Sequence, residues 1–343
     1  MKYFRNSAVF LLVLTAVLGI AMSPQVAASE ATELPMSIKA ILPDNQKDGV
    51  SGYFNLQVNP NEKQTIYIEI KNNKSEDILV NLTPTNAYSQ TTGGIFYDVD
   101  VDSLDTAILD EAFALSQNIS MENEVVIKAN ETIEVPIEIT VPNMNKGTII
   151  GGVLIEEEVE VSEQASETLK KDTAQFKVIT KTAFAIAIQL DLPGQAEPAF
   201  SFGEAGFNAV GPKVYIEMLN DAPIIQRQIA GEYKVSDEEG KELFSGNFEP
   251  IIMAPKTKIN FSMNWDSSAL ESGKYTLSIT ADVAGKEMLV EENFEINNDS
   301  VEEYSARANQ PITQTQGGIP YWAVIIAVVI SVGLTILFVK KKK

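Results

Sequence analysis

The chain contains neither cysteine nor histidine. Without histidine there is no Ser-His-Asp or Cys-His catalysis, and without either residue there is no thiolate or imidazole metal site. The sequence also has no Ser-x-x-Lys motif and no glycine-rich phosphate loop. These absences remove the common catalytic centres, and we predict that the protein is not an enzyme and uses no cofactor.

The amino-terminal segment has the features of an export signal. Lys2 and Arg5 precede an apolar stretch over residues 8–20, and the small residues 26–28 supply a cleavage site. This order of charge, apolar core and small residues predicts a signal peptide over residues 1–28. An uncleaved anchor is the alternative, but the apolar run is short for a bilayer.

The carboxyl-terminal segment has the features of a membrane anchor. Residues 321–339 carry no charge, and at about 1.5 Å per residue they are long enough to cross a bilayer as a helix. Tyr321 and Trp322 suit one interface, and the tail 340–343 is all lysine. The positive-inside rule places that tail in the cytoplasm. We predict a single-pass helix over 319–339, with the rest of the protein outside the cell membrane, in the cell wall.

Positive charge is scarce: 26 lysines and arginines face 47 aspartates and glutamates. Removing the six basic residues of the two end segments leaves 20 − 47 = −27 for the exported part. This balance argues against nucleic acid as a partner, because that binding needs basic residues on phosphates. It also argues against general attraction to an anionic wall, so such a partner must be recognised by shape, by hydrogen bonds or through bridging cations.

Between the end segments, apolar and polar residues alternate with a period of two. Ile66, Ile68 and Ile70 share one face of a predicted strand, and the same alternation recurs over 132–139, 175–190, 259–265 and 275–281. Short alternating strands separated by turn residues predict an all-β protein built of antiparallel sandwiches. Pro136 cannot donate to a sheet ladder, so its strand is expected at an edge.

Composition divides the exported part into three regions. We predict an amino-terminal sandwich over 29–191, a carboxyl-terminal sandwich over 192–297, and a polar stalk over 298–318, with the boundary within 191–197. The helical spacing of Leu104, Ile108, Ala112 and Leu115 predicts a short inserted helix within 103–116.

One group of acids is a weak candidate for a metal site. Asp98, Asp100 and Asp102, with Asp105 nearby, resemble the start of a calcium loop. Ser103 and Leu109 stand where that loop needs glycine and a bidentate glutamate. An edge strand that repels other edges explains the same pattern.

Aromatic residues near predicted turns of the first sandwich have two interpretations. Some could stack on sugars, and others could belong to the core; the residues are Tyr53, Phe54, Tyr88, Phe96 and Tyr97. If Tyr53 and Phe54 both lie in a strand, they point to opposite faces.

The segment 36–58 resembles the opening of the WxL-interacting proteins of Gram-positive bacteria. The shared pattern is an extended strand, Pro-x-Asn-Gln, a short loop and Tyr-Phe-x-Leu, carried by Pro43, Asn45, Gln46, Tyr53, Phe54 and Leu56. Matching residues continue through about 190, and Gly273 to Leu277 and Phe294 to Ile296 resemble the family's carboxyl-terminal module more loosely.

The resemblance implies two immunoglobulin-like sandwiches, the first binding peptidoglycan and the second binding host-derived ligands such as extracellular-matrix proteins. It also implies association at the surface with secreted WxL-domain proteins. Within the signature loop, Asn45, Gln46 and Tyr53 are the candidate binding residues, because amides offer both donors and acceptors to a glycan or peptide. The alternative is that the two amides satisfy backbone groups of the turn.

Two other functions fit the pattern. A chaperone-like module would capture a partner by strand addition, and it requires a long apolar edge without a neighbour. A wall hydrolase would need two carboxyl groups about 5–9.5 Å apart across a cleft.

Overall fold

The computed structural model describes residues 34–101, 105–157, 182–265 and 270–308. The predicted signal peptide, the membrane helix over 319–339 and the lysine tail lie outside these ranges. Within them, none of the helices has the length and apolar character needed to span a membrane.

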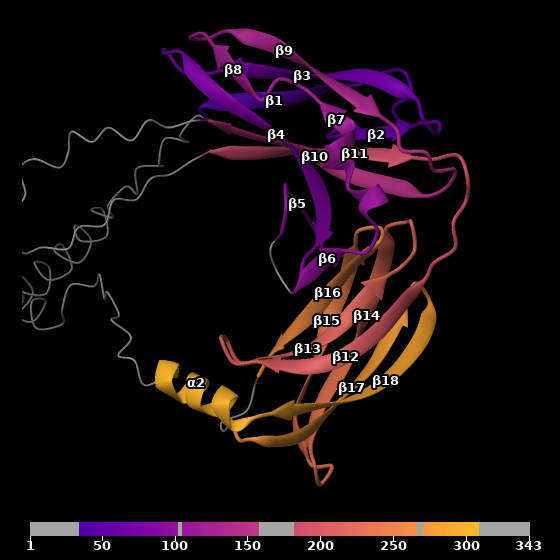
Figure 1. The fold of residues 1–343 in the computed structure, drawn as a ribbon, viewed down its shortest axis with the longest axis vertical. Helices are drawn as coiled ribbons and strands as arrows, with labels where there is room; N and C mark the ends of the chain where they lie inside the picture. Colours follow the sequence, from indigo (N-terminus) through magenta and orange to yellow (C-terminus); the bar gives the residue numbers. More distant parts are fainter. Residues whose placement is uncertain (1–33, 102–104, 158–181, 266–269, 309–343) are drawn as a thin grey trace, which may run out of the picture.

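The first sandwich is drawn at the top of Figure 1 and consists of two sheets. One sheet has the order β1-β3-β9-β7 and the other β2-β11-β10-β4-β5, with β8 paired to β4. The strands are β1 (Met36–Ile41), β2 (Phe54–Gln57), β3 (Lys63–Asn72), β4 (Ile78–Ser89), β5 (Ile95–Asp98), β7 (Ile119–Ser120), β8 (Glu124–Ile127), β9 (Thr132–Thr140), β10 (Thr148–Glu157) and β11 (Ala183–Asp191).

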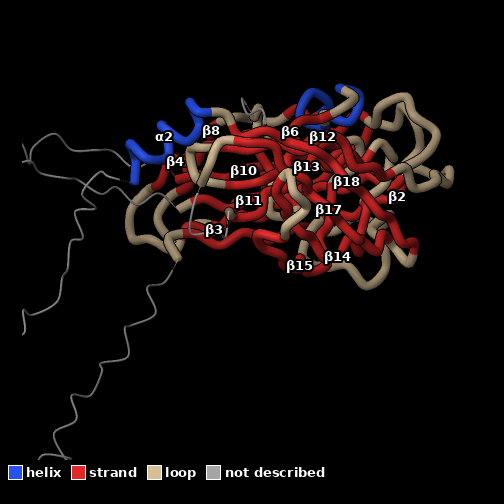
Figure 2. The backbone as a smooth tube through the Cα atoms, turned by 90° about the horizontal axis from the view of Figure 1, so that it is seen from below, coloured by secondary structure: helices blue, strands red, loops and turns tan. Residues whose placement is uncertain are grey.

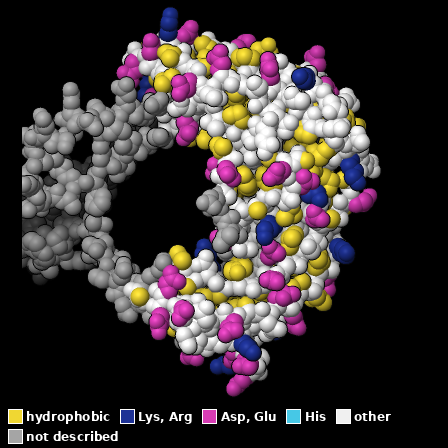
Figure 3. Space-filling view, in the orientation of Figure 1, with side chains coloured by type: hydrophobic (Ala, Val, Ile, Leu, Met, Phe, Trp, Pro, Cys, Tyr) yellow, Lys and Arg dark blue, Asp and Glu magenta, His cyan; other side chains and the backbone are white. Residues whose placement is uncertain are grey.

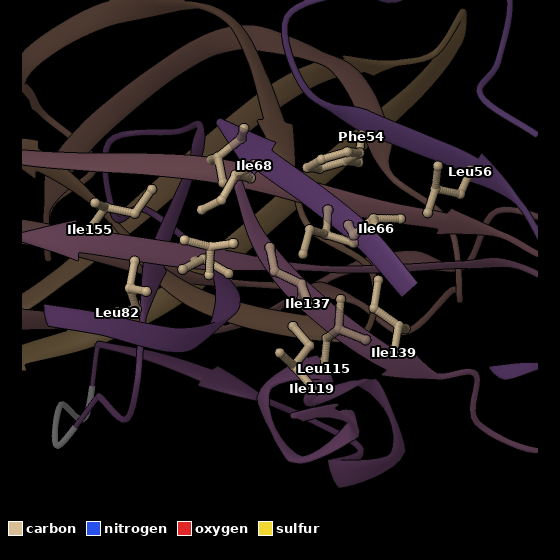
Figure 4. Packing of buried hydrophobic residues seen from close by; sticks show 14 of the residues in the cluster. Phe54, Leu56, Ile66, Ile68, Leu82, Leu115, Ile119, Ile137, Ile139 and Ile155 are labelled. Atoms are coloured by element: carbon tan, nitrogen blue, oxygen red, sulfur yellow. The ribbon is translucent and has the colours of Figure 1, made fainter. Parts of the chain in front are cut away.

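The core of the first sandwich is aliphatic, and the predicted alternation is confirmed in its strands. Ile66, Ile68 and Ile70 of β3 are buried, as are Val135, Ile137 and Ile139 of β9. Figure 4 shows several of these side chains meeting residues of the facing sheet, such as Leu82 and Ile155. β-Branched side chains suit a pleated, half-buried surface, which is why this pattern forms strands.

The second sandwich also consists of two sheets, β12-β13-β16-β6 and β15-β14-β17-β18. Its strands are β12 (Phe200–Asn208), β13 (Lys213–Asn220), β14 (Gln226–Asp237), β15 (Glu242–Met253), β16 (Thr257–Asn264), β17 (Gly273–Val283) and β18 (Lys286–Ile296). Here the core contains an aromatic cluster: Trp265 meets Phe207, Phe244 and Tyr275 edge to face.

One strand of the second sandwich comes from the first part of the chain. β6 (Thr106–Ile108) pairs antiparallel with β16, next to a chain of buried hydroxyl groups. The Ser89 and Thr257 hydroxyls lie 2.6 Å apart, and the Thr106 hydroxyl donates to the Ser89 carbonyl. The two sandwiches are therefore joined by strand pairing and by buried hydrogen bonds.

The predicted helix over 103–116 is wrong. Thr106–Ile108 is strand β6, and two short 3₁₀ turns follow, at Glu111–Phe113 and Leu115–Asn118. Phe113 and Leu115 enter the first core. The spacing mimicked a helix, but pairing with a strand some 150 residues later in the chain, Thr257–Asn264, overrides it.

The first part of the predicted polar stalk is helical, because Asn298–Ala308 forms helix α2. Figure 2 shows this helix at one end of the molecule, beyond the strands. Polar residues without a partner strand can form a helix through local hydrogen bonds alone. The remainder of the predicted stalk, 309–318, lies outside the described residues.

Within the part of the chain that the structure describes, no edge strand is both long and apolar throughout, as strand addition requires, although Leu289 of β18 is exposed. β18 carries exposed Glu287, Glu291 and Glu295; β15 carries exposed Glu249 and Pro250; and β12 has a bulge between Phe202 and Ala205. β1 and β2 are short, with six and four residues. Charges, proline and bulges are the usual protection of sheet edges. Pro136 lies in β9, which pairs outward only through Ile139 and Glu138 with the two-residue β7.

Candidate functional site

Asn45 and Gln46 hold the signature loop in place. The Gln46 side chain donates to the carbonyls of Val50 and Tyr53, at 2.9 and 3.0 Å, and accepts from the Asn55 amide. Asn45 and Gln64 exchange hydrogen bonds through their amides, at 2.8 and 2.9 Å. The Gln46 side-chain amide is thus hydrogen-bonded to the loop backbone through both its nitrogen and its oxygen. The bonding pattern is that of loop supports, and direct binding by these two residues stays a prediction.

Tyr53 is turned away from the core by the same loop. Phe54 is fully buried in the first core, whereas Tyr53 is half-exposed on the other side of the chain. The expectation of opposite faces applies to a strand that holds both residues; Tyr53 lies in a bend before β2 (Phe54–Gln57), so this pair leaves it untested. In β2 itself, Phe54 and Leu56 point into the core, and Asn55 between them points to the outward side of the sheet.

That outward side faces the second sandwich, and we call it the junction face. Asn55 pairs with Gln189, Gln189 with Ile150, and Ala87 with Tyr97, while Ile150 and Ala87 pack in one cluster; the side chains of this row share one face. Ala87, Ile150 and Tyr97 pack with two residues of the second sandwich, Ala254 and Ile225. The row runs from this contact outward to Asn55, close to the signature loop.

Several polar groups of the junction face have no partner within the described part of the chain. The Asn55 side-chain oxygen and the Thr85 hydroxyl are buried without a hydrogen bond. Buried polar atoms are normally paired, and each exception calls for a water or a ligand. Gly152 pairs with Thr85, and a Cβ added to Gly152 would lie 2.6 Å from the Ile186 carbonyl oxygen. The sheet therefore has no room for a larger residue at this position.

Tyr97, on β5, lies on this face, and Tyr53 lies in the bend just before β2. Burial raises the pKa of Tyr97, and the electrostatic effect of Tyr53 raises it further. Tyr97 was a candidate aromatic in the sequence, whereas Phe54 and Tyr88 proved to be buried core residues.

Asp191, at the end of β11, accepts hydrogen bonds from three side chains. Its carboxylate accepts from the Thr148 hydroxyl at 2.9 Å, from the Gln189 amide at 2.8 Å and from the Lys47 ammonium at 3.2 Å. A carboxylate with three donors around it is arranged as a hydrogen-bond acceptor of fixed position. Sequence reasoning missed Asp191, because nothing in its local pattern brings Lys47 beside it.

The acids proposed for calcium do not form a described metal centre. Asp98 ends β5 and caps the Val99 amide at 2.7 Å, and Asp100 is exposed. Among the described residues, no group of three or more acids gathers to hold a metal. Asp102 lies outside these residues, so the calcium hypothesis stays a prediction.

Comparison with known families accounts for both sandwiches. Residues 36–157 match the peptidoglycan-binding domain of the WxL-interacting proteins, and residues 196–306 match the host-binding domain of the same proteins. The chain belongs to the WxL-interacting protein family. The first match covers β1 to β10, and with them the signature loop with Tyr53, and Asn55, Thr85 and Tyr97 of the junction face. Among curated proteins, none matches this family member.

Solved structures with some likeness include fimbrial chaperones. The class 5 fimbriae chaperone CfaA is 12% identical, with a TM-score of 0.30, and the match covers 75% of this chain and 99% of that one. The SafB chaperone, solved with the Salmonella enterica SafA pilin, is 14% identical, with a TM-score of 0.32 and coverages of 78% and 99%. At these values the likeness carries no argument about function.

Proposed function

We propose that this protein is a cell-surface binding and scaffolding protein whose junction face holds the glycan of peptidoglycan. The observations that carry the proposal are the part-exposed rings of Tyr53, just before edge strand β2, and Tyr97, on β5, together with two buried polar groups of the same sheet that have no protein partner, on Asn55 and Thr85. Sugars offer many hydroxyls for such groups and apolar ring faces for aromatic side chains. The family match to a peptidoglycan-binding domain supports the same ligand.

The charge of the protein supports recognition by hydrogen bonds and stacking. Acidic side chains are spread over both sandwiches in Figure 3, and the whole chain carries a formal charge of −21. An anionic wall therefore repels most of this surface, and binding needs a site of specific shape. The junction face supplies such a site on a rigid sheet.

The test is co-sedimentation of the purified protein with insoluble peptidoglycan. Tyr53→Ala is expected to lower the affinity about fivefold to tenfold, because one aromatic contact is lost. The matched control is Tyr67→Ala, since Tyr67 is 41% exposed on β3 in the opposite sheet. Equal binding by both variants and the unchanged protein would overturn the assignment of this face.

We further propose that the protein is held in the membrane by residues 319–339 and associates with secreted WxL-domain proteins, with host extracellular ligands as further partners of the immunoglobulin-like second sandwich. The apolar run, the lysine tail and the family membership support this arrangement. Deleting 319–343 is expected to release the protein from the membrane fraction. Co-precipitation with WxL-domain proteins from the native surface tests the partner, and its failure would remove the scaffolding role.

A further inference from the structure

A shallow cleft of about 500 Å³ lies where the two sandwiches meet, and both contribute side chains to its walls. The first sandwich supplies Lys47, Gln189 and Asp191, the linker supplies Glu197, and the second sandwich supplies Arg227. Gln189 also belongs to the junction face, so the cleft continues the proposed glycan site. We call it the junction cleft.

The junction cleft brings two cations together in a chain that has few of them. Lys47 is half-exposed and uses its ammonium on Asp191, with N–H groups left over for a ligand. Arg227 is exposed, and among the described residues it forms no ion pair. A guanidinium is suited to bidentate recognition of a carboxylate.

An irregularity in β14 sets the position of Arg227. The register of β14 against β15 shifts between Gln226 and Ile229, and Gln228 has a φ of 58°, in the left-handed region. A bulge of this kind changes the direction of the side chains beside it. A residue other than glycine with a positive φ is strained, and such residues cluster at functional sites. Beneath it, the Gln226 side-chain oxygen is buried without a partner in the described structure.

The opposite charge is present in the same cleft. Glu197 is exposed and has no ion pair among the described residues, and Asp191 is held rigid by its three donors. A ligand with a carboxylate and an ammonium group can therefore meet a partner for each of its charges. A bare sugar chain without such charges would leave these groups unused.

We infer that the junction cleft binds a short peptide bearing a free carboxylate and an amine, with contacts from both sandwiches. This inference rests on the proposed function, because a peptidoglycan strand carries such peptides on its sugars. The glycan would occupy the junction face and its peptide branch the cleft. The second sandwich, matched as a host-binding domain, then contributes Arg227 to the binding of wall peptide.

The test compares three probes on the full-length protein: intact peptidoglycan, peptide-free glycan strands, and the released peptide fraction. Arg227→Gln and Glu197→Gln are the test variants. Lys234→Gln is the matched control, because Lys234 is exposed on the same strand, β14, but lines another surface. All three variants change one charge without changing side-chain length greatly.

We expect Arg227→Gln to weaken binding of intact peptidoglycan and of the peptide about tenfold and to leave glycan-strand binding unchanged. Lys234→Gln should match the original protein with every probe. The peptide interaction should also weaken as salt rises, because exposed charges are screened. Binding of glycan strands without any peptide binding would overturn this inference and leave the proposed function standing. Binding of the peptide alone would overturn the proposed glycan site, and binding of no probe would overturn both.

Discussion

The two sandwiches share one architecture but place their aromatic residues differently. The core of the first consists mainly of isoleucine, leucine and valine, and its tyrosines 53 and 97 are part-exposed outside that core, Tyr97 on the junction face. The second places aromatic residues inside, with Trp265 among Phe207, Phe244 and Tyr275. An aliphatic core leaves aromatic side chains available at the surface, and this contrast agrees with the ligand site proposed for the first sandwich.

The largest expected change in the free energy of unfolding comes from removing the aromatic cluster of the second sandwich. Trp265→Ala should lower the free energy of unfolding by about 3–5 kcal/mol, because three ring contacts are lost and a cavity remains. In the first sandwich, Ile137→Ala should cost about 2–4 kcal/mol. Urea unfolding followed by circular dichroism measures both. A loss below about 1 kcal/mol for Trp265→Ala would contradict the contrast between the cores.

The close packing of the first sandwich depends on a glycine in β10. A side chain on Gly151 would meet the Thr85 carbonyl oxygen at 2.4 Å and the Leu115 Cβ at 2.8 Å. Gly151→Ala should therefore destabilise the protein by about 1–3 kcal/mol through overpacking. Gly52→Ala is the control, since nothing lies within 4 Å of its added methyl group. Thermal unfolding of the two variants side by side would show whether the sheets are as close as described.

The hydroxyl chain between the sandwiches is expected to have an effect of similar size to that of the glycine. Ser89→Ala leaves the Ala254 amide without its acceptor, in a buried position, and also removes the contact with Thr257. We expect a loss of about 1–3 kcal/mol. Ser245→Ala removes an exposed hydroxyl bonded to Glu242 and should cost about 0.5 kcal/mol or less. Equal stability of both serine variants would show that the link contributes little.

The smallest expected effect is a difference between Tyr97 and Tyr275 in how their phenols titrate at alkaline pH. Burial raises the pKa of Tyr97, and burial followed by Glu271 and Asp237 raises that of Tyr275. Since the folded state holds these protons more tightly, their contribution to stability is complete below about pH 10 and is lost as pH rises through the folded pKa values.

Absorbance titration of Tyr97→Phe and Tyr275→Phe against the original protein measures each phenol by difference. High salt should lower the Tyr275 value, because its carboxylate neighbours are screened, and should change the Tyr97 value much less. The same salt response from both residues would contradict the assigned causes.

Part of the candidate site could be predicted from sequence. Three features depend only on neighbours in the chain, and local patterns therefore report them. They are the signature loop, the exposure of Tyr53 outside the core, and the alternation of Ile66, Ile68 and Ile70. The roles of Asn45 and Gln46 as loop supports were one of two open interpretations, and their hydrogen bonds agree with it.

Local sequence determined the strands and the family of this protein, because period-two burial and a signature of adjacent residues need no distant partner. Only the tertiary structure decided that Thr106–Ile108 joins the second sandwich and that Lys47, Asp191 and Arg227 line one cleft. These residues are far apart in the chain, and they meet because sheet pairing and burial of apolar surface bring their strands together. Such contacts leave no periodic trace in the sequence around any one of them.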